Sequence, residues 1–444
     1  MSLILQIPKD LLILIAEYLS IRDALELGRT CKNLRFLQLS VKMSDLSSVR
    51  DIKAWRRSFP RAIACSPHRS VLLEDLIELL GMRIPELVLN SNRATLTGAV
   101  FAHLPVGSIC KLNISGCNLI SDAVFAYLTG ICELDMSFCD QVTITSAAFA
   151  HLAGIHRLRM SACTQATITD AAFAHLVGIL YLNMSSCNQS TITDAAFVHL
   201  AGIHTLVMSL CRQLTITDTA FRPLAGIHTL NMNGCRQATI TSAAFVHLSG
   251  IHTLDMSACD QATITDAAFA PLAGIHTLVM TACNQATITD AAFAHLAGIH
   301  TLKMAGCNQA SITDAAFAHL AGIHTLDMGR CRQATITDAA FAHLVGIHTL
   351  HMPGCNQASI TDAAFSHLAG IRYLDMTACN QATITDAAFV HLAGIHKLIM
   401  HDCNQATITD AAFAHLVGAN IYLINCYQIS NDPFKSGKFG FVYR

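Results

Sequence analysis

Cysteine and histidine are the chemically reactive residues that stand out in this sequence, because both recur at a fixed interval of 24 residues. Thiols and imidazoles bind metals and act as nucleophiles or bases, so a regular array of either needs an explanation. The cysteines at this interval are Cys139, Cys163, Cys187, Cys211, Cys235, Cys259, Cys283, Cys307, Cys331, Cys355, Cys379 and Cys403.

The cysteine array is best interpreted as buried and reduced. With Cys117 and Cys426 it takes fourteen of the 18 cysteines. One cysteine per repeat forms no Cys-x-x-Cys pair, which argues against structural zinc. Adjacent strands are close enough for a disulfide by distance alone, but a reducing compartment disfavours that bond. We therefore predict thiols that pack and form hydrogen bonds inside the fold.

The histidines form two rows, one from His151 to His415 and one from His156 to His396. Residues copied with a repeat are most simply packed or capping residues, although a pH-sensitive row and a zinc site stay open. No single chemistry needs every position, because four members are replaced by Leu180, Pro223, Pro271 and Arg372.

The sequence has no phosphate loop, no Gly-x-Ser-x-Gly and no carboxylate pair outside the repeats. We therefore expect a protein that is not an enzyme, with no cofactor and no metal.

Each repeat must hold these residues with a short strand and a short helix. In the repeat that begins at Thr287, Leu302 and Met304 alternate with polar neighbours, which is the pattern of a strand with one buried face. The stretch from Asp290 to Ala297 predicts a two-turn helix, capped by Thr289 and ended by Gly298.

A fixed period of this size predicts a stacked solenoid, because neither half of a repeat can bury its apolar face alone. The strands then form one parallel sheet. Helices are wider than the strand spacing of about 4.8 Å, so the predicted α/β stack is curved, with the sheet inside and the short helices outside.

The repeat resembles the leucine-rich repeat, in its cysteine-containing subtype. The pattern Ile-x-x-Leu-x-Met-x-x-Cys is similar to the leucine-rich core, and Ile-Thr-Asp-x-x-Phe-x-x-Leu is similar to the part that follows it. The resemblance covers residues 84–426, in about fifteen repeats. The period of 24 residues is shorter than is usual for that subtype.

Residues 1–40 resemble an F-box, a small all-α domain. The motif starts Ile7-Pro8-x-Asp10-Leu11-Leu12 and ends Thr30-Cys31-Lys32. The resemblance implies binding to the Skp-type adaptor of a cullin ubiquitin ligase. The residues that it assigns to adaptor binding are Ile7, Pro8, Leu11, Leu12, Ile15, Leu19, Asp23 and Leu25.

Two further segments complete the predicted organisation. Residues 41–83 form a helical junction, in which residues 71–80 read as a helix. Residues 427–444 carry no repeat and form a C-terminal cap and tail, which covers the exposed end of the core.

Composition limits the partners and the location. The chain of 444 residues is 52% hydrophobic and 13% charged, with a net charge of −2, so nucleic acid is not expected. No apolar run reaches the roughly 18–20 residues that span a bilayer, and the start is too short for a signal peptide. We expect no membrane contact and an intracellular location, cytoplasmic or nuclear.

The residue between the strand's Leu and Met varies most from repeat to repeat, and it is predicted to face the hollow of the curve, as is the row that contains Ser137. Such a varied row on a rigid sheet can bind a protein, but drift after recent duplication explains it equally well. The candidate target-binding residues are Arg159, Asn183, Asn231, Asp255, Lys303, Asp327, His351 and Asp375, with Tyr181 and Tyr373 beside them.

The leading hypothesis is the substrate-recognition subunit of a Skp-cullin-F-box ubiquitin ligase, with an unknown target protein on the sheet. The alternative is a non-enzymatic interaction scaffold whose N-terminal helices only cap the solenoid. An extracellular adhesion protein is disfavoured by the free cysteines and the lack of a signal peptide.

Overall fold

The structure is a computed structural model that describes residues 42–43, 64–67, 72–90, 96–430 and 441–443. The segment predicted as an F-box, residues 1–40, lies outside these ranges. The chain divides into two units, residues 1–203 and 204–444. Both are built from the predicted repeat of strand, turn, short helix and turn, which confirms the leucine-rich repeat fold.

The first unit contains parallel strands paired in sequence order and a short helix after most of them. Its strands are β1 (Lys42–Met43), β2 (Ala64–Cys65), β3 (Glu86–Val88), β4 (Lys111–Asn113), β5 (Glu133–Asp135), β6 (Arg157–Arg159) and β7 (Tyr181–Asn183). Its α-helices are α4 (Leu73–Gly81), α5 (Gly98–Phe101), α6 (Asp122–Phe125), α7 (Asp170–Phe173) and α8 (Asp194–Phe197).

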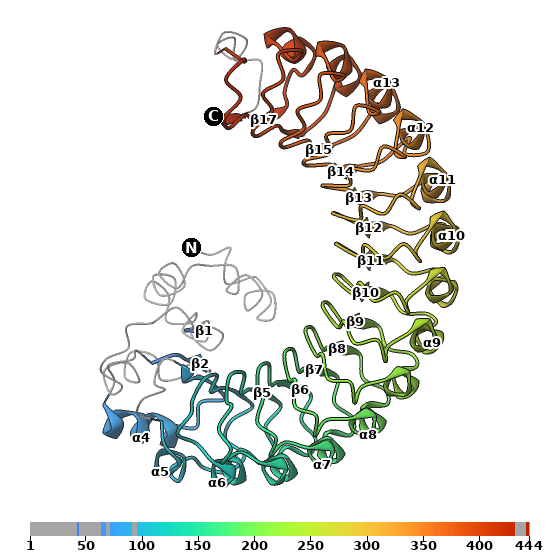
Figure 1. Cartoon of the computed structure of the whole chain (residues 1–444). Helices are drawn as coiled ribbons and strands as arrows, with labels where there is room; N and C mark the ends of the chain where they lie inside the picture. Colours follow the sequence, from blue (N-terminus) through green and yellow to red (C-terminus); the bar gives the residue numbers. More distant parts are fainter. Residues whose placement is uncertain (1–41, 44–63, 68–71, 91–95, 431–440, 444) are drawn as a thin grey trace, which may run out of the picture. The chain divides into compact units, whose positions relative to one another are not determined.

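The second unit repeats this arrangement with strands that again pair in parallel and in sequence order. Its strands are β8 (Thr205–Val207), β9 (Thr229–Asn231), β10 (Thr253–Asp255), β11 (Thr277–Val279), β12 (Thr301–Lys303), β13 (Thr325–Asp327), β14 (Thr349–His351), β15 (Tyr373–Asp375), β16 (Lys397–Ile399), β17 (Asn420–Tyr422) and β18 (Phe441–Tyr443). Its α-helices are α9 (Ser242–Phe245), α10 (Asp290–Phe293), α11 (Asp314–Phe317), α12 (Asp338–Phe341) and α13 (Asp362–Phe365). Within this unit the strands lie on the inner side of a curve and the helices on the outer side (Figure 1).

The core of each repeat lies between strand and helix. Leu302 of β12 and Met304, which directly follows that strand, are fully buried, as are Phe293 of α10 and the anchor thiol of Cys307. Equivalent residues are buried in every regular repeat, so the core is a set of continuous apolar rows.

The helical half is shorter than predicted. Instead of two α-helical turns, α10 is one turn that continues as a 3₁₀ segment, Ala294–Leu296. Side chains three apart line up in a 3₁₀ helix, which puts Phe293 and Leu296 on the same buried face. In other repeats the whole segment is 3₁₀, as at Ser146–Leu152 and Asp386–Leu392.

The anchor cysteines link each repeat to the one before it. The Cys283 thiol donates a hydrogen bond to the carbonyl of Met256, at an S–O distance of 3.1 Å, and Cys307 bonds in the same way to Met280. Burial raises the pKa of the Cys259 thiol to about 12, so this thiol keeps its proton at neutral pH and acts as a donor. None of the cysteines that the structure describes is in a disulfide.

A carboxylate clasp joins the helical halves. Asp290 accepts hydrogen bonds from the backbone N–H and the hydroxyl of Thr313, at 2.7 and 2.6 Å. Thr313 in turn caps α11 by accepting from the N–H of Ala315. The predicted cap, Thr289, makes the same bond to the N–H of Ala291 at 3.2 Å and is therefore confirmed. The acid beside it, Asp290, serves the next repeat rather than only its own helix.

The residue before each anchor cysteine has a left-handed backbone. Ala282 has φ of 58°, and its N–H donates to the carbonyl of Ala305 in the next repeat at 2.8 Å. This conformation costs a non-glycine residue about 1–2 kcal/mol. Hydrogen bonds on both sides of the turn hold it in place.

Two segments differ from the predicted organisation. The junction at 41–83 contains the short strands β1 and β2 besides the predicted helix, because Ala64 and Cys65 are small and fully buried beside β3. At the other end, β18 pairs in parallel with β17, so residues 427–444 add a strand where only a cap and tail were predicted.

The clasp predicts a graded loss of stability at Asp290. We expect Asp290→Ala to cost about 2 kcal/mol in urea unfolding, because it leaves the Thr313 N–H without its charged acceptor. Asp290→Ser is the matched control, since Ser242 occupies the same position and accepts from the N–H of Thr265 at 2.9 Å. Equal losses for the two variants would contradict this account of the clasp.

The left-handed residue predicts a stabilising glycine. We expect Ala282→Gly to raise the free energy of unfolding by about 0.5–1 kcal/mol, because strain at φ of 58° is relieved and only part is returned as chain entropy. Ala291→Gly, at an exposed site in α10, should instead destabilise by about 1 kcal/mol. Thermal unfolding of both variants measures the difference, and a loss of stability in Ala282→Gly would refute the strain argument.

Candidate protein-binding surface

The exposed face of the strands carries all ten predicted target-binding residues. In β12, Thr301 and Lys303 point away from the buried Leu302. Because the strands are in register, these positions form two rows across each unit. Tyr181 and Tyr373 lie in the first row and the other eight in the second. In the neighbouring row, however, Ser137 and Ser257 are buried, which corrects the expectation that Ser137 faces the hollow.

Most acidic and amide residues of the second row have a structural role that the sequence analysis missed. One side-chain oxygen of Asp255 accepts the N–H of Ser257, two residues further on, at 3.0 Å. The same bond ends the strand at Asp135, Asn183, Asn231, Asp327 and Asp375. Such turns are typical of Asp and Asn. The remaining candidates of this row, Arg159, Lys303 and His351, show no such bond to the backbone.

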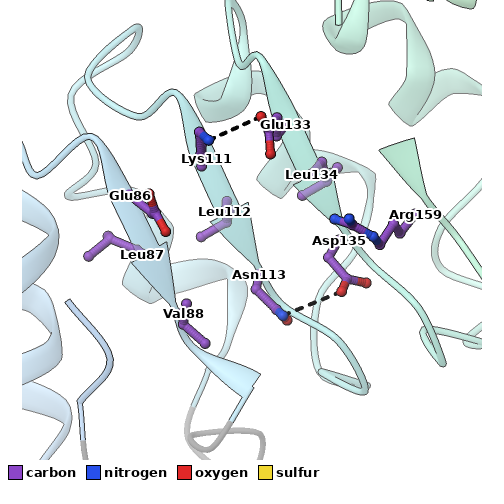
Figure 2. A pocket seen from close by; sticks show the side chains of 10 residues that line it. All are labelled: Glu86, Leu87, Val88, Lys111, Leu112, Asn113, Glu133, Leu134, Asp135 and Arg159. Carbon is purple, nitrogen blue, oxygen red and sulfur yellow. Dashed lines mark hydrogen bonds and ion pairs between the residues drawn. The ribbon is translucent and has the colours of Figure 1, made fainter. Parts of the chain in front are cut away.

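A shallow hollow of about 160 Å³ opens on the strand face of the first unit (Figure 2). Lys111 and Glu133 form an ion pair across it at 3.1 Å, and the Asn113 amide donates to Asp135 at 3.4 Å. The bond to Glu133 raises the pKa of Lys111. Arg159 lies at one side of the hollow, next to Asp135 (Figure 2).

Beside this hollow, Tyr181 is flanked by two cations. The guanidinium carbons of Arg157 and Arg159 lie 4.4 and 5.2 Å from the centre of its ring. Cation–π contacts of this kind orient both partners. Tyrosine and arginine are also the residues that most often dominate protein interfaces, so this part of the face can anchor a protein partner.

A second group of this kind lies in the second unit, and we call His351, Tyr373, Asp375, Lys397 and Tyr422 the tyrosine cluster. The Lys397 ammonium lies 5.2 Å from the Tyr373 ring and 4.8 Å from the Tyr422 ring. His351 packs against Tyr373 at 4.8 Å between ring centres, and its Nδ1 lies 3.8 Å from the Asp375 carboxylate. Two members of the cluster, Tyr373 and Lys397, take the first-row position that threonine holds in β8 to β14.

The environment of the cluster shifts two pKa values. Burial and the nearby Asp375 charge raise the pKa of Tyr373. Burial also opposes ionisation of Asp375, but hydrogen bonds from His351 and Thr377 outweigh it and hold the pKa of that carboxyl below its usual range. Asp375 is thus ionised at neutral pH, while Tyr373 keeps its proton.

One of the two predicted histidine rows forms a continuous stack in the second unit. Ring centres from His204 to His348 are 4.4–4.6 Å apart and nearly parallel, at 11–13°. Each Nδ1 lies 3.0–3.2 Å from the hydroxyl of the threonine that follows. Partial desolvation and the neighbouring imidazoles His204 and His252 lower the pKa of His228.

The part of the chain that the structure describes contains no group of three or more His, Cys, Asp or Glu side chains able to hold a metal ion. Its helices are also too short or too polar to cross a bilayer.

Residues 4–43 match the F-box domain model, and the described repeats resemble known leucine-rich repeat structures. The chain combines an F-box domain with leucine-rich repeats. No curated protein matches the sequence.

Three solved structures place the fold of this F-box and leucine-rich repeat chain. A leucine-rich repeat protein of Leptospira interrogans is 12% identical, with a TM-score of 0.52 over 74% of this chain and 93% of that one. Toll in the Drosophila Toll–Spatzle complex is 15% identical, with a TM-score of 0.56 over 74% of this chain and 48% of that one. TLR13 in a complex with ssRNA13 is 15% identical, with a TM-score of 0.59 over 87% of this chain and 62% of that one. The chain thus spans less than two thirds of the last two proteins, and these identities support the fold alone.

The tyrosine cluster predicts a measurable pH effect. We expect the Asp375 carboxyl to titrate below its ordinary pKa of 3.8 in NMR. His351→Ala should raise this pKa, because it removes a hydrogen bond that stabilises the ionised carboxylate against the effect of burial. Since the folded-state pKa is depressed, the ionised carboxylate stabilises the fold above the unfolded-state pKa. That contribution is lost as the pH falls through the folded-state pKa. His324→Ala, in the histidine stack, is the control and should leave Asp375 unchanged.

Proposed function

We propose that this protein is the substrate-recognition subunit of a Skp-cullin-F-box type ubiquitin ligase. The observation that carries the proposal is the F-box match at residues 4–43, followed by a rigid sheet with a varied exposed face. In this proposal the F-box docks the Skp-type adaptor, and the exposed strand face holds a target protein. The protein itself acts inside the cell and catalyses no reaction.

Adaptor docking is assigned to the apolar residues of the F-box. These lie outside the described residues, so the assignment rests on the motif alone, and the residues concerned are Ile7, Pro8, Leu11, Leu12, Ile15, Leu19, Asp23 and Leu25. A segment of about forty residues with this much apolar surface needs a partner to cover it.

Target binding is assigned to the strand face, with two anchor regions. One is Tyr181 with its flanking arginines, and the other is the tyrosine cluster. Both combine aromatic rings with fixed cations, which bind a protein at low cost in side-chain entropy. The short strands and their cross-repeat hydrogen bonds give these side chains a rigid support.

The proposed mechanism is proximity. A receptor that binds the ligase at one end and a target elsewhere raises the local concentration of target lysines near the ubiquitin-loaded enzyme. Such a receptor needs two binding surfaces and no catalytic group of its own.

The proposal predicts that the two surfaces can be separated by mutation. We expect the full chain to co-purify with a Skp-type adaptor and a cullin, and Leu11→Asp to abolish this by placing a charge in the apolar docking face. Tyr373→Ala together with Arg159→Ala should retain the adaptor but weaken capture of ubiquitylated targets by tenfold or more, on the order of a hot-spot loss.

The control is Leu11→Asp in a target-capture assay, where target binding should persist. If the unmodified protein binds no Skp-type adaptor, the ligase proposal fails. If Leu11→Asp only causes aggregation of an otherwise partner-free protein, the N-terminal helices are a cap and the chain is an interaction scaffold.

A further inference from the structure

Two arginines, a glycine and an asparagine line a hollow on the loops that follow β12 and β13. Its lining residues are Gly306, Asn308, Arg330 and Arg332, and its volume is about 380 Å³. All four lie next to the anchor cysteines, Cys307 and Cys331. The hollow is therefore on the loop edge of the second unit, separate from the tyrosine cluster on the strands.

Arg330 lies between two glycines of its row. Arg330 has the left-handed backbone of its row, with φ of 58°, and its equivalents in the adjacent repeats are Gly306 and Gly354. A Cβ on Gly354 would lie 3.5 Å from Arg330 Cγ and 3.7 Å from Arg332 Nη2. A Cβ on Gly306 would meet nothing within 4 Å. The space is thus open on the Gly306 side.

Arg332 is held at its base and along its side chain. Its backbone N–H donates to Asn308 Oδ1 at 2.8 Å, and its Nε–H donates to the carbonyl of Gly354 at 3.2 Å. A guanidinium carries five N–H donors, so the four on the Nη atoms are still available. A guanidinium that is fixed in this way loses little entropy when it binds an anion.

The chain itself shows what such an arginine binds. Arg236 occupies the same repeat position as Arg332, and its Nε–H donates to the equivalent carbonyl, that of Ala258, at 3.0 Å. There the neighbouring repeat supplies an acid, and Arg236 Nε lies 3.5 Å from the carboxylate of Asp260. In the repeat after Arg332 the equivalent residue is Asn356.

The positive charge of the arginine pair is therefore not compensated locally. Among the described residues, no ion pair involves Arg330 or Arg332. Two exposed guanidinium groups that line one hollow repel each other, and an anion between them removes that repulsion.

We propose that Arg330 and Arg332 form a binding site for a phosphate group, which lies in this hollow and supplies the negative charge that Asp260 supplies beside Arg236. Two guanidinium groups match a doubly charged tetrahedral anion better than they match a single carboxylate. The phosphate group comes either from free phosphate or from a phosphorylated side chain of a protein. This proposal does not depend on the F-box.

The first test is a titration of the full-length protein with inorganic phosphate at constant ionic strength, followed by ³¹P NMR. We expect saturable binding in the millimolar range or tighter. Arg330→Gln and Arg332→Gln should each weaken it about tenfold or more, because each removes charge-assisted hydrogen bonds. Asn356→Asp keeps both arginines but adds the missing carboxylate, so it should weaken binding as well. Arg236→Gln is the matched control and should change nothing.

A second arm separates the two sources of phosphate. A short phosphoserine peptide that binds at least tenfold more tightly than inorganic phosphate would assign the site to a phosphorylated protein, whereas equal affinities would assign it to free phosphate. The proposal is overturned if the unmodified chain shows no saturable phosphate binding, or if the Arg330, Arg332 and Asn356 variants bind like the unmodified chain. If the unphosphorylated peptide binds as well as the phosphopeptide, the peptide is not held through its phosphate, and the site is assigned to free phosphate.

Discussion

The structure depends on polar side chains that satisfy the main chain of an adjacent repeat. In one repeat, Cys283 donates to Met256, Thr287 donates to Ile264, and Asp290 accepts from Thr313. Each bond lies next to the apolar core, where an unpaired donor or acceptor is costly. A repeat is therefore complete only between two others, and this requirement explains why the polar residues that make these bonds recur from repeat to repeat.

This constraint also separates structural from functional positions on the strand face. Asp255 and its equivalents end the strand by accepting a backbone N–H, so their recurrence needs no partner. Arg159, Lys303 and His351 make no such bond, and the tyrosines beside them replace threonine. The residues that depart from the repeat are thus the ones whose side chains are available for recognition, on the strand face and at Arg330 and Arg332.

Periodicity in the sequence was sufficient for the strand, the buried Leu302 and Met304, the cap at Thr289 and the turn at Gly298, because these are properties of one repeat. It did not predict that the helix continues as a 3₁₀ segment, because the spacing of Phe293 and Leu296 fits an α-helix nearly as well. Nor could it predict the clasp at Asp290, the contact of Lys397 with two tyrosines, or the missing acid beside Arg332. Those features arise only when neighbouring repeats are placed in register, and the sequence of one repeat carries no direct signal for contacts between repeats.

The equivalence of successive repeats has a consequence for how such a gene can change. If one whole repeat is lost or duplicated, every donor at the new junction finds an acceptor of the same kind, so the array closes again without a defect. An insertion of a single residue does break these bonds, because it shifts the thiol, the hydroxyl and the carboxylate away from their partners in the adjacent repeat at the same time. Lineages that carry this array are therefore expected to differ in length by multiples of 24 residues, and the length of the strand face is expected to change in the same steps.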